Sequence, residues 1–252
     1  MIEVRNITKR YNGKEVVDNV SVVLPTEKII ALIGGNGAGK STILSIISRL
    51  IAANEGVVLI DEVELNKWNT RELAKNLAIL GQSTHFNIRL TVEDLVRFGR
   101  FPHSQGKITD EDRKMVDRAL EYTGLTGLKD RFVDELSGGQ RQTAYIAMAI
   151  AQDTKYILLD EPLNNLDMRR SGQIMRLLRG LVDEKGKTVI IVIHDINFVS
   201  FHADYVVALK QGRLASLGTV SEIINPDVLR KIYDMDIAVE NYKGKSLCIY
   251  YQ

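Results

Sequence analysis

The stretch of sequence that decides the fold reads GGNGAGKS and spans residues 34–41. An apolar run, KIIALI at residues 28–33, leads into it, and apolar residues after Lys40 recur at helical spacing as far as Leu50. This order predicts a buried strand, a tight glycine loop and a helix. The stretch matches the pattern G-x-x-x-x-G-K-[ST], in which backbone N–H groups and a helix amino terminus cradle the phosphates of a nucleotide. A glycine-rich turn without a ligand is the alternative, but the position between a strand and a helix favours phosphate binding.

Within this phosphate loop, we expect Lys40 to reach the β- and γ-phosphates and the Ser41 hydroxyl to bind Mg²⁺. The expected nucleotide-binding residues are Gly34, Asn36, Gly37, Ala38, Gly39, Lys40, Ser41 and Thr42. Such a loop leaves kinases, GTPases and many ATPases open, so other motifs have to decide between them.

A second motif is a strand that ends in two acids, the run YILLDE at residues 156–161. At the end of a buried strand, Asp160 can hold hydrated Mg²⁺, and Glu161 can orient or deprotonate the attacking water. Two solvated acids at a strand end would be the ordinary interpretation. The phosphate loop earlier in the chain makes the catalytic interpretation the better one.

A third motif, LSGGQ at residues 136–140, stands immediately before a long helical pattern. Ser137 could simply cap that helix. Exposed N–H groups and the Ser137 hydroxyl, at the positive end of the helix dipole, could also contact a γ-phosphate.

The phosphate loop, LSGGQ and the strand ending in DE occur in the order typical of the ABC ATPase family, and the resemblance runs through essentially the whole chain. The resemblance implies ATP as the nucleotide, with Mg²⁺. It also implies two copies that face head to tail, so that each ATP lies between the phosphate loop of one copy and the LSGGQ motif of the other. The motif residues expected to bind ATP in this way are Ser137, Gly138, Gly139 and Gln140. A single copy would hold only half-sites.

Four further residues take their expected roles from the same resemblance. Gln82 resembles the Q-loop glutamine, which touches Mg²⁺ or water and links the site to the membrane partner. His194 resembles the switch histidine, which contacts the γ-phosphate. Tyr11 resembles the aromatic residue that stacks on adenine, and a core or edge-strand tyrosine is the alternative. Asp167 resembles the D-loop aspartate that works across the dimer interface, and a simple helix cap would look similar.

The periodic patterns together with the resemblance predict an α/β fold. We expect a P-loop NTPase core of the RecA-like type, with an antiparallel β subdomain and an inserted helical subdomain. Residues 1–87 and 153–219 are expected to form the core with the β subdomain, residues 88–152 the helical subdomain that carries LSGGQ, and residues 220–252 a C-terminal extension. The predicted helices of the insert are 91–98, 110–122 and 137–151.

Composition narrows the class of partner. The 33 basic side chains are balanced by 32 acidic ones, which gives no overall attraction to nucleic acid, and we expect no nucleic-acid partner. The single cysteine, Cys248, excludes an internal disulfide, and its alternating surroundings predict a half-buried strand residue. The first residues lack the pattern of a signal peptide, and no apolar run is long enough to span a bilayer. We therefore expect the chain on the cytoplasmic side of the cell membrane, bound there through another protein.

Three segments narrow the resemblance. They are TVEDLV at 91–96, GRFPH at 99–103 and DEPLNNLDM at 160–168, and they are similar to the importer branch that serves iron-siderophores, haem and cobalamin. This implies the ATPase subunit of a bacterial importer, with iron-siderophore as the preferred cargo. Its expected partners are permease subunits that dock through the Q-loop region, a second copy of the chain and, indirectly, a substrate-binding lipoprotein. The alternatives are an exporter ATPase, a soluble ABC ATPase of DNA repair or translation, and a P-loop kinase, which would leave LSGGQ unexplained.

Overall fold

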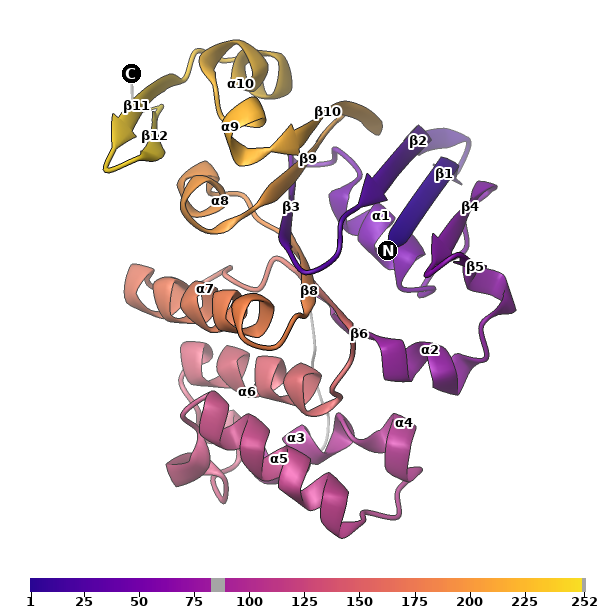
Figure 1. The fold of residues 1–252 in the computed structure, drawn as a ribbon, viewed down its shortest axis with the longest axis vertical. Coiled ribbons are helices and arrows are strands. Elements are labelled where there is room, and N and C mark those ends of the chain that lie inside the picture. Colours follow the sequence, from indigo (N-terminus) through magenta and orange to yellow (C-terminus); the bar gives the residue numbers. More distant parts are fainter. Residues whose placement is uncertain (83–88, 251–252) are drawn as a thin grey trace. The chain divides into compact units, whose positions relative to one another are not determined.

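The computed structural model describes residues 1–82 and 89–250. The chain divides into two compact units, one made of Met1–Trp68 with Arg179–Gln252 and the other of Asn69–Leu178 (Figure 1). The predicted boundary between residues 87 and 88, and the last two residues of the predicted extension, lie outside the described residues. Within the described ranges, no helix has both the length and the apolar character that crossing a membrane would require.

An antiparallel sheet opens the first unit. Its strands lie in the order β2-β1-β4-β5 and are β1 (Ile2–Tyr11), β2 (Lys14–Leu24), β4 (Glu55–Ile60) and β5 (Val63–Glu64). Asn12 and Gly13 connect the first two strands, and both have positive φ angles, 49° and 79°. A two-residue hairpin loop with a type I′ turn requires positive φ angles at both positions. The predicted antiparallel β subdomain is therefore confirmed.

Buried strands form the centre of the first unit. They lie in the order β10-β9-β3-β8 and are β3 (Ile29–Ile33), β8 (Thr188–Val192), β9 (Tyr205–Lys210) and β10 (Arg213–Thr219). β3 runs parallel to both β8 and β9. Every residue of β3 and β8 is buried, which explains why their sequences are continuously apolar instead of alternating. α1 (Lys40–Ile47) follows β3 after the phosphate loop.

The C-terminal part of the first unit adds small elements. They are α8 (Ile196–His202), α9 (Val220–Ile223), α10 (Pro226–Tyr233), β11 (Ala238–Tyr242) and β12 (Lys245–Ile249). β11 and β12 pair as a separate antiparallel hairpin. Cys248 on β12 is only 2% exposed, more buried than the half-buried residue that the sequence predicts. The reason is that β12 packs against α8, a contact that alternation within one strand does not reveal.

The second unit is mainly helical. Its helices are α2 (Thr70–Asn76), α3 (Val92–Phe98), α4 (Phe101–Ser104), α5 (Asp110–Tyr122), α6 (Gly138–Ala151) and the first part of α7 (Met168–Asp183). Two parallel strands, β6 (Leu77–Leu80) and β7 (Tyr156–Asp160), accompany them. Short 3-10 turns occupy Leu65–Lys67 in the first unit and Thr126–Leu128 and Val133–Glu135 in the second. The unit extends beyond residues 88–152, whose assignment as a helical subdomain stays a prediction.

A buried ion pair joins three helices of this unit. Arg100, at the start of α4, donates from Nε to Asp112 of α5 at 2.9 Å and from Nη1 to the Ala151 carbonyl at the end of α6 at 2.8 Å. Both charged side chains are less than a tenth exposed. The next residues, 101–104, form a short helix, and a proline in the first turn suits a helix start.

Candidate functional site

The phosphate loop connects the end of β3 to the start of α1, and its backbone requires glycine at two positions. Gly34 has a φ of 137°, and a Cβ atom there would lie 2.1 Å from the Leu209 carbonyl oxygen. Gly39 has a φ of 97°, and a Cβ atom there would lie 2.8 Å from the Val16 carbonyl oxygen. The loop can pass close to these strands only because both residues lack a side chain.

The ammonium group of Lys40 is held over this loop. The residue is 5% exposed, and Nζ donates to the carbonyl oxygens of Gly34 at 2.9 Å and Gly35 at 3.0 Å. Ser41 and Thr42 lie half-buried in the first turn of α1. The exposed tip of the loop consists of Gly35, Asn36 and Gly37, and it leads into the buried residues Ala38 and Gly39. Backbone N–H groups, a helix start and a positive charge therefore meet in one place, as phosphate binding requires.

In the second unit, the structure brings Gln82 and Glu161 together. Leu80 of β6 pairs with Leu159 of the parallel strand β7, so the residues that follow them emerge at the same edge. Gln82 Nε2 donates to Glu161 Oε2 at 2.7 Å. Asp160, the last residue of β7, is 9% exposed. The two strand ends thus place a carboxylate and an amide in direct contact, although 79 positions separate them in the sequence.

Two features fix the orientation of Glu161. Its φ is 52°, in the left-handed region that a residue with a side chain seldom adopts. The side-chain amide of Asn164 also donates to Glu161 Oε2, so that oxygen accepts hydrogen bonds from two amides. A carboxylate held in this way has a restricted choice of rotamers.

The LSGGQ motif forms the start of α6. The Ser137 hydroxyl accepts a hydrogen bond from the Gln140 N–H at 3.3 Å, and Gln140 Oε1 accepts one from the Ser137 N–H at 3.1 Å. This reciprocal pair is a capping box, so the helix-cap interpretation of Ser137 holds. Ser137 and Gly138 remain exposed at the positive end of a helix of 14 residues. The cap and an anion contact are compatible, because the first N–H groups of the helix still point outward.

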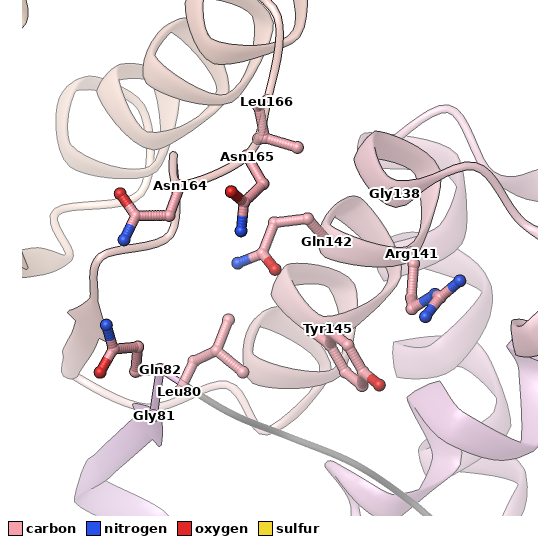
Figure 2. Close-up of a pocket in the computed structure, with 10 residues that line it drawn as sticks. All are labelled: Leu80, Gly81, Gln82, Gly138, Arg141, Gln142, Tyr145, Asn164, Asn165 and Leu166. Atoms are coloured by element: carbon pink, nitrogen blue, oxygen red, sulfur yellow. The ribbon is translucent and has the colours of Figure 1, made fainter.

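A polar hollow of about 300 Å³ lies within the second unit (Figure 2). It is lined by residues 80–82 at and after the end of β6, by the first turns of α6 and by residues 164–166. The Gln142 amide extends into the space between α6 and the loop that carries Asn164. The atom Nε of Arg141 is buried and has no hydrogen-bond partner among the described residues. The lining consists of Leu80, Gly81, Gln82, Gly138, Arg141, Gln142, Tyr145, Asn164, Asn165 and Leu166.

Three predicted residues remain, which are Asp167, Tyr11 and His194. Asp167 accepts a hydrogen bond from the Arg170 N–H at 2.8 Å, which makes it a cap of α7, and its role across an interface stays a prediction. Tyr11 ends β1 and is 46% exposed, with the Lys9 ammonium 5.1 Å from its ring centre. His194 is exposed after β8.

The structure also adds residues for which no sequence motif predicts a role. Asn164 donates a hydrogen bond to Glu161. The spacing in the sequence is compatible with this contact, because an amide three residues after the second acid can fold back onto it in a turn. Arg141, Gln142 and Tyr145 line the hollow from one face of α6. Their spacing of one and three residues places them on one side of a helix, but nothing in the sequence shows which segment that side contacts.

Comparison with known proteins is consistent with this geometry. The family model described as ABC transporter matches residues 17–164. The petrobactin import ATP-binding protein YclP of Bacillus subtilis (strain 168) is 53% identical over 251 residues, which span both chains completely. The iron(3+)-hydroxamate import ATP-binding protein FhuC of the same organism is 40% identical over 96% of this chain and 91% of its own.

Among solved structures, the dimeric ATP-binding cassette MJ0796, in a post-hydrolysis state bound to ADP and Pi, superposes with a TM-score of 0.78. It is 31% identical and covers 87% of this chain and 99% of its own. The similarities extend over almost the full length and include the fold, so the chain belongs to the ABC transporter family.

Proposed function

We propose that this chain is the ATP-hydrolysing subunit of an importer for iron-siderophore complexes. The observation that carries the cargo class is the similarity over nearly the whole chain to relatives named for petrobactin and iron(3+)-hydroxamate import. ATP hydrolysis is supported by the phosphate loop and by the pair of acids at the end of β7.

The phosphate loop binds the nucleotide in this proposal. Backbone N–H groups of residues 34–41 and the start of α1 bind the phosphates, and Lys40 leaves its two carbonyl partners to reach the β- and γ-phosphates. Tyr11 stacks on adenine, for which its exposed ring at the end of β1 is suited.

The chain offers a small set of oxygen ligands for Mg²⁺. We assign the Ser41 hydroxyl, the Asp160 carboxylate and the Gln82 side-chain oxygen to it. No cluster of three or more His, Cys, Asp or Glu side chains suited to a metal ion occurs in ranges 1–82 and 89–250. That fits Mg²⁺, which keeps phosphate oxygens and waters as most of its ligands. When bound, the ion neutralises the charge that develops on the phosphates.

We assign to Glu161 the role of activating the attacking water. The carboxylate accepts a proton from the water while the water oxygen forms a bond to the γ-phosphorus. The bond between that phosphorus and the β–γ bridging oxygen breaks in the same step. Gln82 and Asn164 hold the carboxylate in place for this step. His194 contacts the departing γ-phosphate.

Each complete site requires a second copy of the chain in this proposal. The exposed amino terminus of α6, with Ser137, Gly138, Gly139 and Gln140, contacts the γ-phosphate bound to the other copy, and Asp167 works across the interface. The dimeric form of the cassette MJ0796 with ADP and Pi supports this arrangement.

We further propose that the chain lies on the cytoplasmic side of the membrane, where permease subunits bind it through the Q-loop region, and that a substrate-binding lipoprotein delivers the cargo to them. The residues directly after Gln82 lie outside the described residues. An apolar hollow of about 270 Å³ is lined by Leu90, Phe98 and Phe101, among others. The side chains of Phe98 and Phe101 are 47% and 60% exposed. Exposed aromatic side chains beside a hollow suit an apolar partner helix.

An uptake assay tests the proposed function. In a strain that lacks this chain, the chain should restore uptake of ⁵⁵Fe bound to a siderophore, and Lys40→Ala should not restore it. In the purified protein, Lys40→Ala should abolish ATP hydrolysis. Hydrolysis that depends on Lys40, together with siderophore uptake that does not depend on the chain, would reject the cargo and retain the ATPase.

A further inference from the structure

The C-terminal hairpin is bound to α8 by two side chains of that helix. Asn197 Nδ2 donates to the Cys248 carbonyl oxygen at 3.1 Å, and Asn197 Oδ1 accepts from the Cys248 N–H at 2.8 Å. The Ser200 hydroxyl donates to the carbonyl oxygen of Ser246. One amide side chain thus satisfies both backbone groups of one strand residue, as a neighbouring strand would.

The geometry of helix and strand explains why the three bonds form together. Asn197 and Ser200 are three residues apart, so they share one face of α8. Ser246 and Cys248 are two residues apart on β12, so their backbone groups point to the same edge. Because their N–H and C=O groups bond to α8, that edge is the one facing away from β11. The helix therefore covers an edge that would otherwise expose backbone groups.

The position of α8 connects this contact to the proposed catalytic histidine. His194 directly precedes Asp195, which caps α8 by accepting hydrogen bonds from the N–H groups of Asn197 at 2.8 Å and Phe198 at 3.4 Å. The residue whose side chain binds β12 is therefore the residue whose N–H the cap binds. A shift of α8 at Asn197 would be passed on to His194 through the three peptide units between them.

Two titratable groups of the C-terminal extension are buried. The Tyr233 hydroxyl, at the end of α10, is buried and has no hydrogen-bond partner among the described residues. Burial raises the pKa of Tyr233 to about 12, although the Gly34 backbone works against the rise. Burial together with the negative charge of Asp195 raises the pKa of the Cys248 thiol to about 11. The charge of Asp195, which caps α8, therefore acts on the Cys248 thiol of the hairpin.

We propose that the bonds from Asn197 and Ser200 to β12 form a latch that positions His194, so that Asn197 is a positioning residue for ATP hydrolysis. The proposal rests on the role assigned above to His194. The latch holds the first turn of α8 against the hairpin, and the histidine keeps its place only while the latch is closed.

Cys248 reports directly on the latch, because it is the only cysteine of the chain and is 2% exposed. We expect its thiol to react slowly with dithionitrobenzoate in the native protein. Asn197→Leu removes both hydrogen bonds at similar side-chain volume and should raise the labelling rate about 30-fold, which corresponds to roughly 2 kcal/mol at 1.4 kcal/mol per tenfold. Ser200→Ala removes one bond and should raise the rate about fivefold.

Steady-state kinetics then separate positioning from general destabilisation. Asn197→Leu should lower kcat about tenfold, while the Kd for ATP stays within about twofold, because the phosphate loop is intact. Asn241→Leu is the matched control, since Asn241 lies in the same hairpin but its side chain accepts a hydrogen bond from the Gly244 N–H within the turn. It should change kcat and the labelling rate by no more than about twofold.

Two results would overturn the latch. Faster labelling of Cys248 with unchanged kcat would show that the hairpin does not position His194, and unchanged labelling in Asn197→Leu would show that the amide does not hold the hairpin. If that variant fails to fold, Ser200→Ala decides by the same two measurements. His194→Ala is assayed in parallel, and full activity in that variant would reject the proposed role of His194 whatever the labelling rates.

Discussion

Replacing Arg100 with methionine should lower the free energy of unfolding by about 3–5 kcal/mol, the usual cost of removing one partner of a buried ion pair. Methionine keeps most of the apolar length of the side chain. Loss of the guanidinium group, however, removes the Arg100 donor from two buried acceptors, Asp112 Oδ1 and the Ala151 carbonyl oxygen. The carboxylate dominates the cost, because an unpaired buried charge is far less stable than an unpaired carbonyl.

The pH dependence of this effect has a definite sign. Burial tends to raise the pKa of Asp112, but hydrogen bonds from the Thr109 N–H and hydroxyl and from Arg100 outweigh it, so the pKa lies below its ordinary value of 3.8. A carboxyl group with a lowered pKa stabilises the fold at pH values above its unfolded pKa, and that stability is lost as the pH falls through the folded pKa. The difference between the native chain and Arg100→Met should therefore be largest at neutral pH and shrink below about pH 4.

Urea denaturation followed by circular dichroism measures these quantities. Asp112→Asn keeps the cap of α5 and removes the charge, and the double variant should cost at least about 1 kcal/mol less than the sum of the single ones. Arg97→Met is the control, because Arg97 is 40% exposed in its pair with Glu93 and should cost less than about 0.5 kcal/mol. Costs that add to within about 0.5 kcal/mol would refute the claim that the buried pair acts as a unit.

Two further predictions concern the site. Asn164→Ala removes one of the two amides that hold Glu161 and should lower kcat about tenfold, with the Kd for ATP unchanged, in a coupled ATPase assay; an unchanged kcat would show that this contact is dispensable. Gly34→Ala should abolish ATP binding measured by calorimetry, because its Cβ would lie 2.1 Å from a carbonyl oxygen. Gly35→Ala, whose Cβ would meet nothing within 4 Å, should bind ATP normally, and equal affinities of these two variants would contradict the loop geometry.

The sequence predicts the elements of this fold where one local pattern dominates. The helix at residues 110–122 and the turn at Asn12 and Gly13 follow from apolar spacing and from turn chemistry, and the structure has both. No sequence pattern predicts α4, because its four residues are too few to show a helical period. Its proline and the buried Arg100 before it acquire their meaning only from the helices around them.

The candidate site divides in the same way. Residues of the phosphate loop, the two acids and the LSGGQ motif can be found individually, since each motif has a fixed spacing and a chemical reason for it. The contact between Gln82 and Glu161 depends on the parallel register of β6 and β7, which no local pattern specifies. The bond between Asn197 and β12 likewise joins residues 51 positions apart. Contacts between distant segments come from the packing of whole elements.

The central claim is that ATP is bound between two copies of the chain, and light scattering with size-exclusion chromatography tests it most directly. Glu161→Gln should bind MgATP without hydrolysing it and should elute with twice the mass of one chain. The same variant with Ser137→Arg should stay at the mass of one chain, because the added side chain blocks the exposed start of α6. A protein that binds MgATP but remains a single chain, or a dimer that survives Ser137→Arg, would contradict the shared site.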